Sequence, residues 1–305
     1  MSDRLVFDRR QIRRQRDRAA LALGQHDFLL RDVAGRLADR LLDTTRRFPL
    51  ALDIGCHAGE AARALRAGGR IERLVSCDMS AAMAARAGRA GDADDVLVAD
   101  EEALPFAERS FDLVASNLSL HWVNDLPGTL MQIHRVLKED GLFLATLIGG
   151  TTLCELRQCL IDAELADVGG VSPRVSPFVD VRDAGALLQR AGFALPVVDL
   201  DTIVVTYASA LGLLADLRGM GETNAVRARR KTFSRRATLL SALALYEQRF
   251  KGADGRLPAT VQIITLTAWR PHPLQQRPLA RGSGQADLAR VLGGGSPVDG
   301  DGEKG

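Results

Sequence analysis

The sequence predicts a doubly wound α/β fold, in which helices cover both faces of a mostly parallel sheet. A short apolar run, residues 50–54, enters a glycine-containing turn and then a helix-favouring stretch, EAARALRA. Further apolar strand segments alternate with helical ones, and Asp53, Asp78 and Asp100 stand at the ends of the first three strands. Because parallel strands share a carboxyl edge, these carboxylates are expected to meet in the crevice where such sheets bind ligands.

The turn after the first strand has a specific glycine spacing. Asp53, Gly55 and Gly59 fit the pattern hhDhGxxxG, which is similar to that of class I S-adenosylmethionine-dependent methyltransferases. The dinucleotide motif GxGxxG needs a third glycine, so the spacing here differs from it. The resemblance implies that Asp53 faces the cofactor's amino group, with Gly55, Cys56 and Gly59 forming the loop. The alternative is an ordinary strand-to-helix turn.

The second and third strands supply the remaining carboxylates of the expected cofactor site. Asp78, followed by Met79, lies roughly 20 residues beyond the glycines, where a carboxylate can accept both hydroxyls of a ribose. Asp100, followed by Glu101, occupies the place where the methyltransferase pattern has an acceptor for the adenine amino group. The alternative for each aspartate is a helix N-cap.

The fourth predicted strand, residues 111–116, opens at Asn117 into LSLHWVND, from which the sheet edge meets the reactive sulfonium. His121 and Trp122 lie just past this strand and are the candidate catalytic residues. A polar loop residue that packs on the adenosine or the sheet edge is the alternative for His121. The five histidines show no spacing typical of an iron triad, and no CxxC pair indicates zinc, so no metal ligand set is predicted.

Composition limits the class of protein. The chain has 305 residues, 46% hydrophobic and 26% charged, which is enough for a full globular core. A net charge of +2 gives no overall field toward nucleic acid, and no apolar run approaches the roughly 18 residues of a membrane span. Four scattered cysteines and the lack of a secretory signal at the start predict a reducing, cytoplasmic location.

Three regions are expected. Residues 1–49 form an N-terminal helical flank, residues 50–270 the cofactor-binding domain, and residues 271–305 an extension that is disordered from about 282. The arginine-rich start, residues 9–18, is interpreted as a solvated helix face rather than a partner or membrane contact.

The second half of the chain is expected to provide the substrate side. A helix over residues 152–166 begins just after the fifth strand, which places Glu155 and Arg157 near the pocket rim. A plain packing helix is the alternative. The segments LPVVDLDTIVVTY and TVQIITLTAWR are predicted to form the antiparallel pair that ends the sheet.

A helical insertion, residues 208–257, separates those two last strands and is expected to cover the mouth of the site. Within it, LRGMGETNA carries Arg218, Glu222 and Asn224, which are candidates for recognition of a protein substrate. A helix C-cap followed by a new N-cap is the alternative. The basic run 227–236 has one aromatic residue, so a solvated face or a docking patch is favoured over nucleic-acid binding.

Several motifs together resemble one family. RRFPLALDIGCHAG, VLVADEEALPF, FDLVASNLSLHWVNDLP, GGTTLCELR and LRGMGETNA resemble, in order, the family of mitochondrial complex I assembly factor 5 and its bacterial relatives. The resemblance covers about residues 5–285. The last two motifs are not needed to bind S-adenosylmethionine, which makes the match more specific. One departure is His57, which replaces the middle glycine of the family's GCGxG; histidine tolerates φ > 0 better than most residues.

The resemblance implies a class I methyltransferase-like, seven-stranded fold that binds S-adenosyl-L-methionine. It also implies that the protein hydroxylates an arginine of the quinone-site subunit of respiratory complex I, the NADH dehydrogenase, during assembly. The expected place is the cytoplasm with a peripheral membrane contact, or the matrix side of the inner membrane in a eukaryote. Two alternatives stay open: a conventional methyltransferase acting on a small molecule or carrier protein, and a non-catalytic, cofactor-binding assembly chaperone.

Overall fold

The structure of the chain is a computed structural model that describes residues 5–275. The described residues as far as Pro271 belong to one compact unit, and His272 to Gln275 belong to a second. The tail from about residue 282, which the sequence predicts to be disordered, lies outside the described residues.

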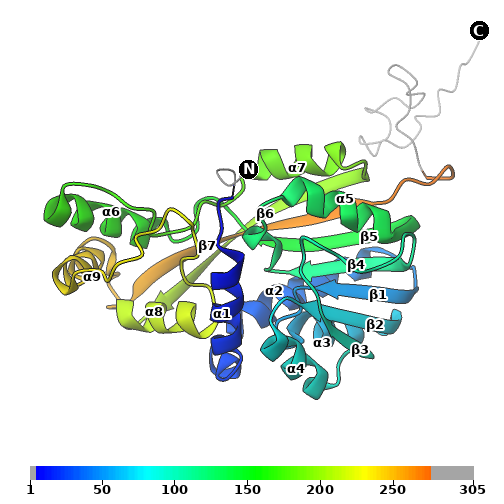
Figure 1. Cartoon of the computed structure of the whole chain (residues 1–305), viewed down its shortest axis with the longest axis horizontal. Helices are drawn as coiled ribbons and strands as arrows, with labels where there is room; N and C mark the ends of the chain where they lie inside the picture. The colour runs from blue at the N-terminus through cyan, green and yellow to red at the C-terminus, as the bar shows by residue number, and fades with distance from the viewer. Residues whose placement is uncertain (1–4, 276–305) are drawn as a thin grey trace, which may run out of the picture. The chain divides into compact units, whose positions relative to one another are not determined.

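In the described part of the chain, seven strands form one sheet in the order β3-β2-β1-β4-β5-β7-β6 (Figure 1). The strands are β1 Phe48–Ile54, β2 Ile71–Asp78, β3 Asp95–Val98, β4 Phe111–Asn117, β5 Leu137–Ile148, β6 Ala194–Tyr207 and β7 Leu257–Trp269. The pairs from β3 to β5 are parallel, and β7 is antiparallel to both β5 and β6. The predicted seven-stranded α/β sheet with an antiparallel end is therefore confirmed.

Helices cover both faces of this sheet. They are α1 Arg9–Ala19, α2 Phe28–Asp39, α3 Glu60–Ala67, α4 Ala81–Ala90, α5 Leu126–Val136, α6 Cys154–Val168, α7 Val181–Arg190, α8 Ala210–Gly219 and α9 Arg236–Phe250, with short 3₁₀ turns η2 Leu23–Gln25, η3 Arg40–Asp43 and η4 Leu120–Trp122. Side chains alternate across each strand, so Ala51 packs with α2 and α3 while Leu52 packs with α5 and α7. Both faces are therefore apolar, as a sheet buried on two sides requires.

The chain reverses its direction of travel across the sheet between β1 and β4. It runs from β1 outward through β2 to β3, then returns to β4 on the other side of β1. Asp53 of β1 lies opposite Ser76 on one side and Ala115 on the other. Ligands of doubly wound sheets bind at the carboxyl ends of the strands beside such a reversal, which is the edge where the predicted cofactor residues stand.

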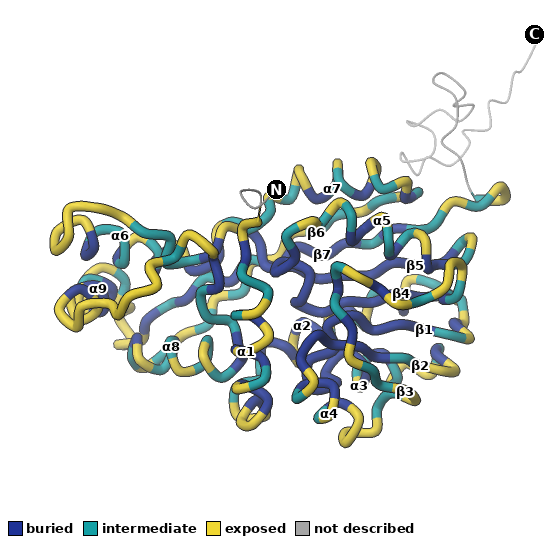
Figure 2. Tube along the Cα trace, viewed as in Figure 1, coloured by how far each residue is buried: buried dark blue, intermediate teal, exposed yellow. Residues whose placement is uncertain are grey.

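A second, smaller core lies on the far part of the β6–β7 pair. Beyond the end of β5, residues 257–262 of β7 pair only with β6, and the packing there comes from α6, α8 and α9. Figure 1 shows these helices grouped around the extended ends of the two strands. In Figure 2 the sheet centre is buried, whereas the chain before α9 is exposed. The segment between β6 and β7 thus contains α8 and α9.

Candidate active site

Asp53, near the end of β1, is a fully buried carboxyl group without a hydrogen bond. Neither of its oxygens has a partner among the described residues, and the nearby Ser76 hydroxyl makes no hydrogen bond of good geometry to it. Burial, together with the carboxylates of Glu60 and Asp78, raises the pKa of Asp53 to about 8. Such an orphaned acid would be satisfied by a cationic donor from a ligand.

The loop after β1 turns sharply over the end of β2. The backbone N–H groups of Gly55 and Cys56 both donate to the carbonyl of Cys77, at 2.8 and 3.0 Å. Gly55, His57 and Gly59 have positive φ values of 68°, 49° and 97°. His57 therefore adopts the left-handed conformation that glycine takes without strain, consistent with the family's glycine at this position. Gly59 precedes the first residue of α3.

Asp78, the last residue of β2, accepts hydrogen bonds from three elements. The backbone N–H of Ser80 donates to Oδ1 at 2.8 Å, and that of His57 donates to Oδ2 at 3.2 Å. Arg16 Nη1, from α1, lies 3.2 Å from Oδ2. The aspartate thus joins the β1 loop, the start of α4 and α1 at one buried point.

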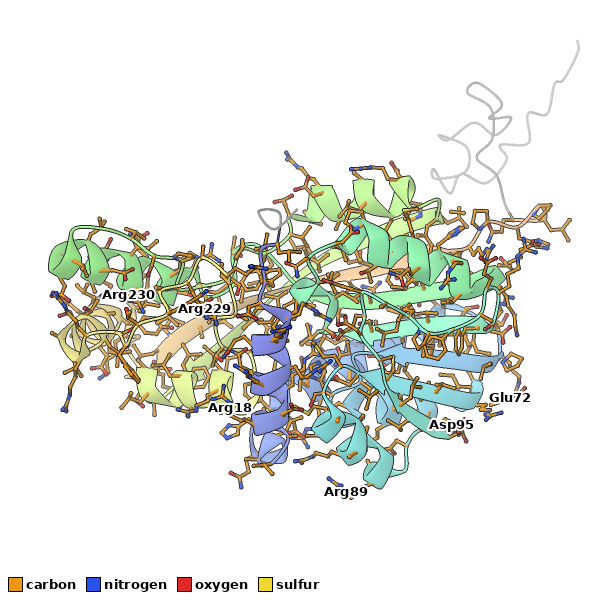
Figure 3. The ribbon with its side chains drawn as sticks, in the orientation of Figure 1. Arg18, Glu72, Arg89, Asp95, Arg229 and Arg230 are labelled. Carbon is orange, nitrogen blue, oxygen red and sulfur yellow. The ribbon has the colours of Figure 1, made fainter. Side chains whose placement is uncertain are left out.

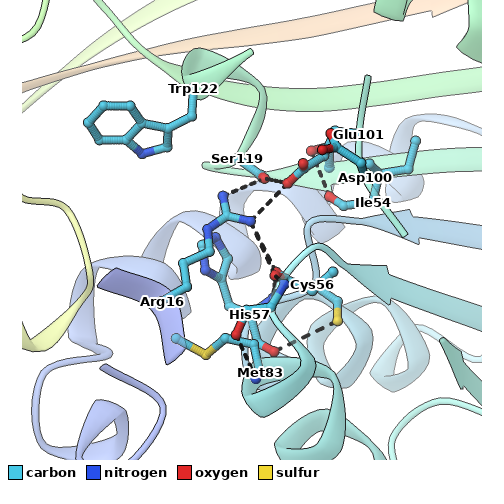
Figure 4. Close-up of polar contacts among 12 residues, drawn as sticks. Arg16, Ile54, Cys56, His57, Met83, Asp100, Glu101, Ser119 and Trp122 are labelled. Carbon is cyan, nitrogen blue, oxygen red and sulfur yellow. Dashed lines mark hydrogen bonds and ion pairs between the residues drawn. The ribbon is translucent and has the colours of Figure 1, made fainter. Parts of the chain in front are cut away.

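The acidic pair after β3 is held by two arginines of α1. Glu101 is fully buried and accepts hydrogen bonds from Arg16 Nη1 and Ser119 Oγ, both at 2.8 Å, and from Arg9. Burial alone would raise the pKa of Glu101, but the Arg16 and Arg9 guanidinium groups outweigh it and hold the pKa at about 2. Asp100 is partly exposed and pairs with Arg9 Nη2 at 2.5 Å. Figure 4 shows the Arg16 guanidinium reaching Glu101 and Ser119.

The interpretation of residues 9–18 as a solvated helix face is wrong for two of its arginines. Arg16 is 1% exposed and Arg9 is 14% exposed at the side chain. They lie on the same face of α1 as the buried Ile12 and Ala19, following helical spacing. Charged groups so placed are stable because each meets carboxylates. The exposed arginines of this run are Arg10, Arg13, Arg14 and Arg18, the last of which is labelled in Figure 3.

The residues just before α1 tie the helix to the helical insertion. Phe7 forms a strand-like bridge with Val226, and its ring packs edge-on against Trp122 with centroids 5.3 Å apart. Asn124 Oδ1 accepts from the Phe7 N–H at 2.7 Å, and the Asp8 side chain caps the start of α1. The short motif Phe7-Asp8-Arg9 therefore anchors α1 against the acidic pair after β3 and the helical insertion.

Two further predicted cofactor residues, Met79 and Asn117, are both buried. Met79 packs in an apolar cluster with Ile12 of α1. Asn117 Nδ2 donates to the Leu30 carbonyl at 2.9 Å, and its Oδ1 accepts from Thr146 Oγ1 at 2.9 Å. The amide of Asn117 thus connects β4 to α2 and β5.

His121 and Trp122, in η4, share one acidic partner. Glu222 Oε2 is 2.8 Å from Trp122 Nε1 and 3.1 Å from His121 Nε2. Burial would raise the pKa of Glu222, but His121, then His57 and Arg16, lower it below the ordinary value. The two candidate catalytic residues and one substrate candidate therefore form a single hydrogen-bonded group.

A cavity of about 240 Å³ opens next to this group. Trp122, Glu222 and Asn224 line it, whereas its other walls are mostly apolar. These apolar walls include Phe28 and Leu29 of α2, Leu153, Leu156 and Leu160 near α6, Val175, Phe178, Val205, and Leu213, Leu214 and Leu217 of α8. The cavity lies between the larger sheet core and the smaller core of α6, α8 and α9.

The remaining substrate candidates do not line this cavity. The Glu155 carboxylate bonds to the backbone N–H and hydroxyl of Thr260. Arg157 donates to the Ser176 carbonyl at 3.3 Å. Arg218, in the last turn of α8, is exposed and borders a separate depression. Of the five, the structure brings only Glu222 and Asn224 to the cavity.

The Asn224 amide is occupied by backbone partners. Its Nδ2 donates to the Pro173 carbonyl at 2.7 Å, and its Oδ1 accepts from the Val226 N–H at 3.0 Å. Gln15 of α1 donates to the Asn224 carbonyl at 3.3 Å. Asn224 therefore shapes the segment that carries Glu222.

Sequence reasoning missed Arg9, Arg16 and Ser119. The available signal was the helical spacing of Arg9, Ile12 and Arg16, which puts the two arginines on the same helix face as an apolar residue.

Across residues 5–275, no three histidine, cysteine, aspartate or glutamate side chains are grouped so as to hold a metal ion. No helix among those residues has the length and apolar character needed to cross a bilayer.

Comparisons with known proteins identify the family of the chain and its fold. Residues 52–145 match the model of a methyltransferase domain family. The chain is 44% identical over 291 residues to "Arginine-hydroxylase NDUFAF5, mitochondrial" of Danio rerio, covering 94% of the chain and 90% of that protein. It is 37% identical over 302 residues to "Malonyl-[acyl-carrier protein] O-methyltransferase" of Methylovorus sp., covering 92% and 99%.

Among solved structures, the chain is similar to the YcgJ protein of Bacillus subtilis, with a TM-score of 0.54 and 16% identity. The similarity covers 77% of this chain and 98% of that one. The fold is that of class I S-adenosylmethionine-dependent methyltransferases, as the sequence predicts.

Proposed function

The chain belongs to the family of arginine-hydroxylase NDUFAF5, and on that premise we propose that it hydroxylates an arginine of the quinone-site subunit of respiratory complex I during assembly. The relatives' name, arginine-hydroxylase, supports the reaction class. In this reaction one oxygen atom of dioxygen enters a C–H bond of the arginine. The other oxygen atom leaves as water, and a reductant supplies two electrons and two protons.

The observation that supports this proposal is that Glu222 stands between two groups of residues. One is the cluster of buried acidic side chains at the ends of β1 and β2 and just after β3, and the other is the mostly apolar cavity lining. Trp122 and Glu222 belong to the wall of the cavity, while Arg16 and His57 of the acidic cluster also act electrostatically on Glu222. This arrangement is suited to a cofactor bound at the acidic residues and to one side chain of a substrate protein bound in the cavity.

The acidic residues at the strand ends fit S-adenosylmethionine, which we propose as the cofactor. The orphaned carboxyl of Asp53 would accept from the cofactor's ammonium group, Asp78 would bind the ribose hydroxyls, and Asp100 the adenine amino group. When bound, the cofactor supplies a positively charged sulfonium centre. For the Asp78 carboxylate to accept from the ribose hydroxyls, its ion pair with Arg16 must break, or Arg16 and the ribose must both bind to its oxygens.

Methyl transfer is the second candidate. It is favoured by the relatives named as malonyl-carrier-protein methyltransferases, which the chain matches over nearly their whole length at lower identity. A carrier-bound acyl group could also enter an apolar cavity, so the cavity alone does not separate the two reactions.

Mass spectrometry of the quinone-site subunit from cells with and without this gene tests the proposal. An arginine that is lighter by about 16 Da, one oxygen, in the deletion strain is the expected result. A change of about 14 Da on another molecule would favour methyl transfer. Impaired assembly of complex I without either mass change would favour the non-catalytic, cofactor-binding assembly chaperone.

The proposal includes a peripheral contact with the membrane that holds complex I. Residues 227–236, just before α9, are mostly exposed and basic, and Phe233 is fully exposed (Figure 3 labels Arg229 and Arg230). Basic residues around an exposed aromatic ring suit an anionic lipid surface.

Sedimentation with vesicles tests this contact. Phe233→Ser should reduce binding to anionic vesicles, and Leu21→Ser, at another exposed apolar residue, is the matched control. Equal sedimentation with anionic and neutral vesicles, or no effect of Phe233→Ser, would argue against it.

A further inference from the structure

The cavity beside Trp122 has one acidic group in a mostly apolar wall. Of the described residues that line it, Glu222 is the only acidic one. Its volume of about 240 Å³ is below the roughly 300–1,000 Å³ typical of sites for drug-sized ligands. The cavity is therefore suited to a single side chain.

The Glu222 carboxylate is oriented and has a free oxygen. Two ring N–H donors, from Trp122 and His121, point at Oε2, while Oε1 has no hydrogen-bond partner among the described residues. The side chain is 16% exposed and belongs to the cavity wall. An oriented carboxylate with one open oxygen on a cavity wall can accept from a cation or another hydrogen-bond donor that enters the cavity.

Arg174, on the cavity wall, is already bound to two residues that do not line the cavity. Arg174 is the one cationic side chain among the described lining residues. Its Nη2 lies 2.7 Å from Glu164 Oε1, and its Nη1 donates to Ser234 Oγ at 2.6 Å. The cavity can thus accept a further positive charge, which a ligand would bring.

We propose that this cavity receives the arginine side chain of the substrate protein, with the guanidinium group on Glu222 and the methylene stem against the leucines of α6 and α8. This inference rests on the proposed function and deepens it by assigning the substrate subsite. Trp122 adds a ring against which a guanidinium can stack. His121 acts as a positioning residue, because it holds Glu222.

The side-chain analogue n-butylguanidinium tests the subsite without any turnover. The chain has two tryptophans, so Trp269→Phe leaves Trp122 as the only indole reporter. Because the Trp122 N–H donates to Glu222, a guanidinium on Glu222 should change its emission in a saturable way. n-Butylurea, a neutral molecule of similar shape, should not do so at equal concentration, with sodium chloride matching the ionic strength.

Glu222→Gln should weaken butylguanidinium binding about tenfold or more, because the charge is lost while the amide can still accept from Trp122. Glu247→Gln is the matched control, because Glu247 is an exposed glutamate of α9 that does not line the cavity, so its change should leave binding unaltered. Equal binding of butylguanidinium and butylurea to the Glu222-containing protein would overturn the proposal, even if the Glu222 variant does not fold.

The two proposals can fail separately. Hydroxylation of the subunit, with butylguanidinium binding that does not depend on Glu222, would keep the reaction and reject this subsite. Glu222-dependent binding, with no mass change on the subunit, would keep a guanidinium site and reject the proposed reaction.

Discussion

Arg16 Nη1 lies 3.2 Å from Asp78 Oδ2, so the carboxylate expected to bind the ribose is paired with a buried arginine of the first helix. The same nitrogen donates to Glu101 at 2.8 Å. A fully buried guanidinium between two carboxylates makes α1 part of the expected cofactor site.

Arg16→Gln should destabilise the protein by about 3–5 kcal/mol, because it leaves the buried Asp78 and Glu101 without their shared cation. Arg13→Gln, at an exposed position on the same helix, should change stability by less than about 0.5 kcal/mol. Urea unfolding of both variants measures the difference. Equal midpoints would show that the Arg16 ion pairs contribute nothing net.

Asp78→Asn should weaken S-adenosylmethionine binding by about 1–3 kcal/mol, because the ribose loses a charged acceptor. Asp95→Asn is the control. Asp95 is the first residue of β3 and pairs with the exposed Arg73 of β2. Isothermal titration calorimetry gives both affinities. Unchanged affinity in the Asp78 variant would remove this residue from the cofactor site.

The buried Asp53 should make stability depend on pH. Its pKa rises from 3.8 to about 8 on folding, so between these values the folded state holds a proton that the unfolded chain has lost. The free energy of unfolding should therefore fall as pH rises from about 4 to about 8, by up to about 1.4 kcal/mol per pH unit from this group.

Asp53→Asn should remove that part of the slope, because the amide does not titrate. Urea unfolding of both proteins from about pH 5 to about pH 8 measures it. Parallel pH profiles for the two proteins would show that Asp53 keeps an ordinary pKa in the folded state.

Gly55→Ala should disrupt the loop by more than backbone strain alone. A Cβ at Gly55 would lie 1.9 Å from Ser119 Oγ, which bonds to Arg16 and Glu101. Gly91→Ala has a similar φ, 76° against 68°, but its Cβ would meet nothing within 4 Å. Comparing thermal unfolding of the two variants separates the steric cost from the strain of about 1–2 kcal/mol. An equal loss of stability would mean that Ser119 moves aside freely.

The sheet could be predicted from the sequence because its signals are local. Apolar runs that end in Asp53 and Asp78, each followed by a turn and a helix, mark the strand ends directly. The Ser80 cap of α4 was likewise visible as a serine before a helical segment, and its hydroxyl accepts from the Met83 N–H.

The partners of Arg16 could not be predicted in the same way. Asp78 and Glu101 lie 62 and 85 positions away in the sequence, so only the fold brings the three together. An arginine-rich helix is ordinarily a solvated one, and although helical spacing puts Arg9 and Arg16 on the same face as Ile12, the local pattern does not identify the carboxylates that they meet. The cavity is equally non-local, since its walls come from α2, η4, α6, β6, α8 and β7.

The bridge between Phe7 and Val226 joins α1 to the segment that carries Glu222. If a cofactor bound at Asp78 displaces Arg16, as the proposed function requires, we expect the movement of α1 to reach the wall of the neighbouring cavity through this bridge. Occupancy of one proposed site would then change the free energy of binding at the other, and by reciprocity the reverse would hold to the same extent. The affinity for the cofactor is therefore expected to depend on whether a substrate side chain fills the cavity.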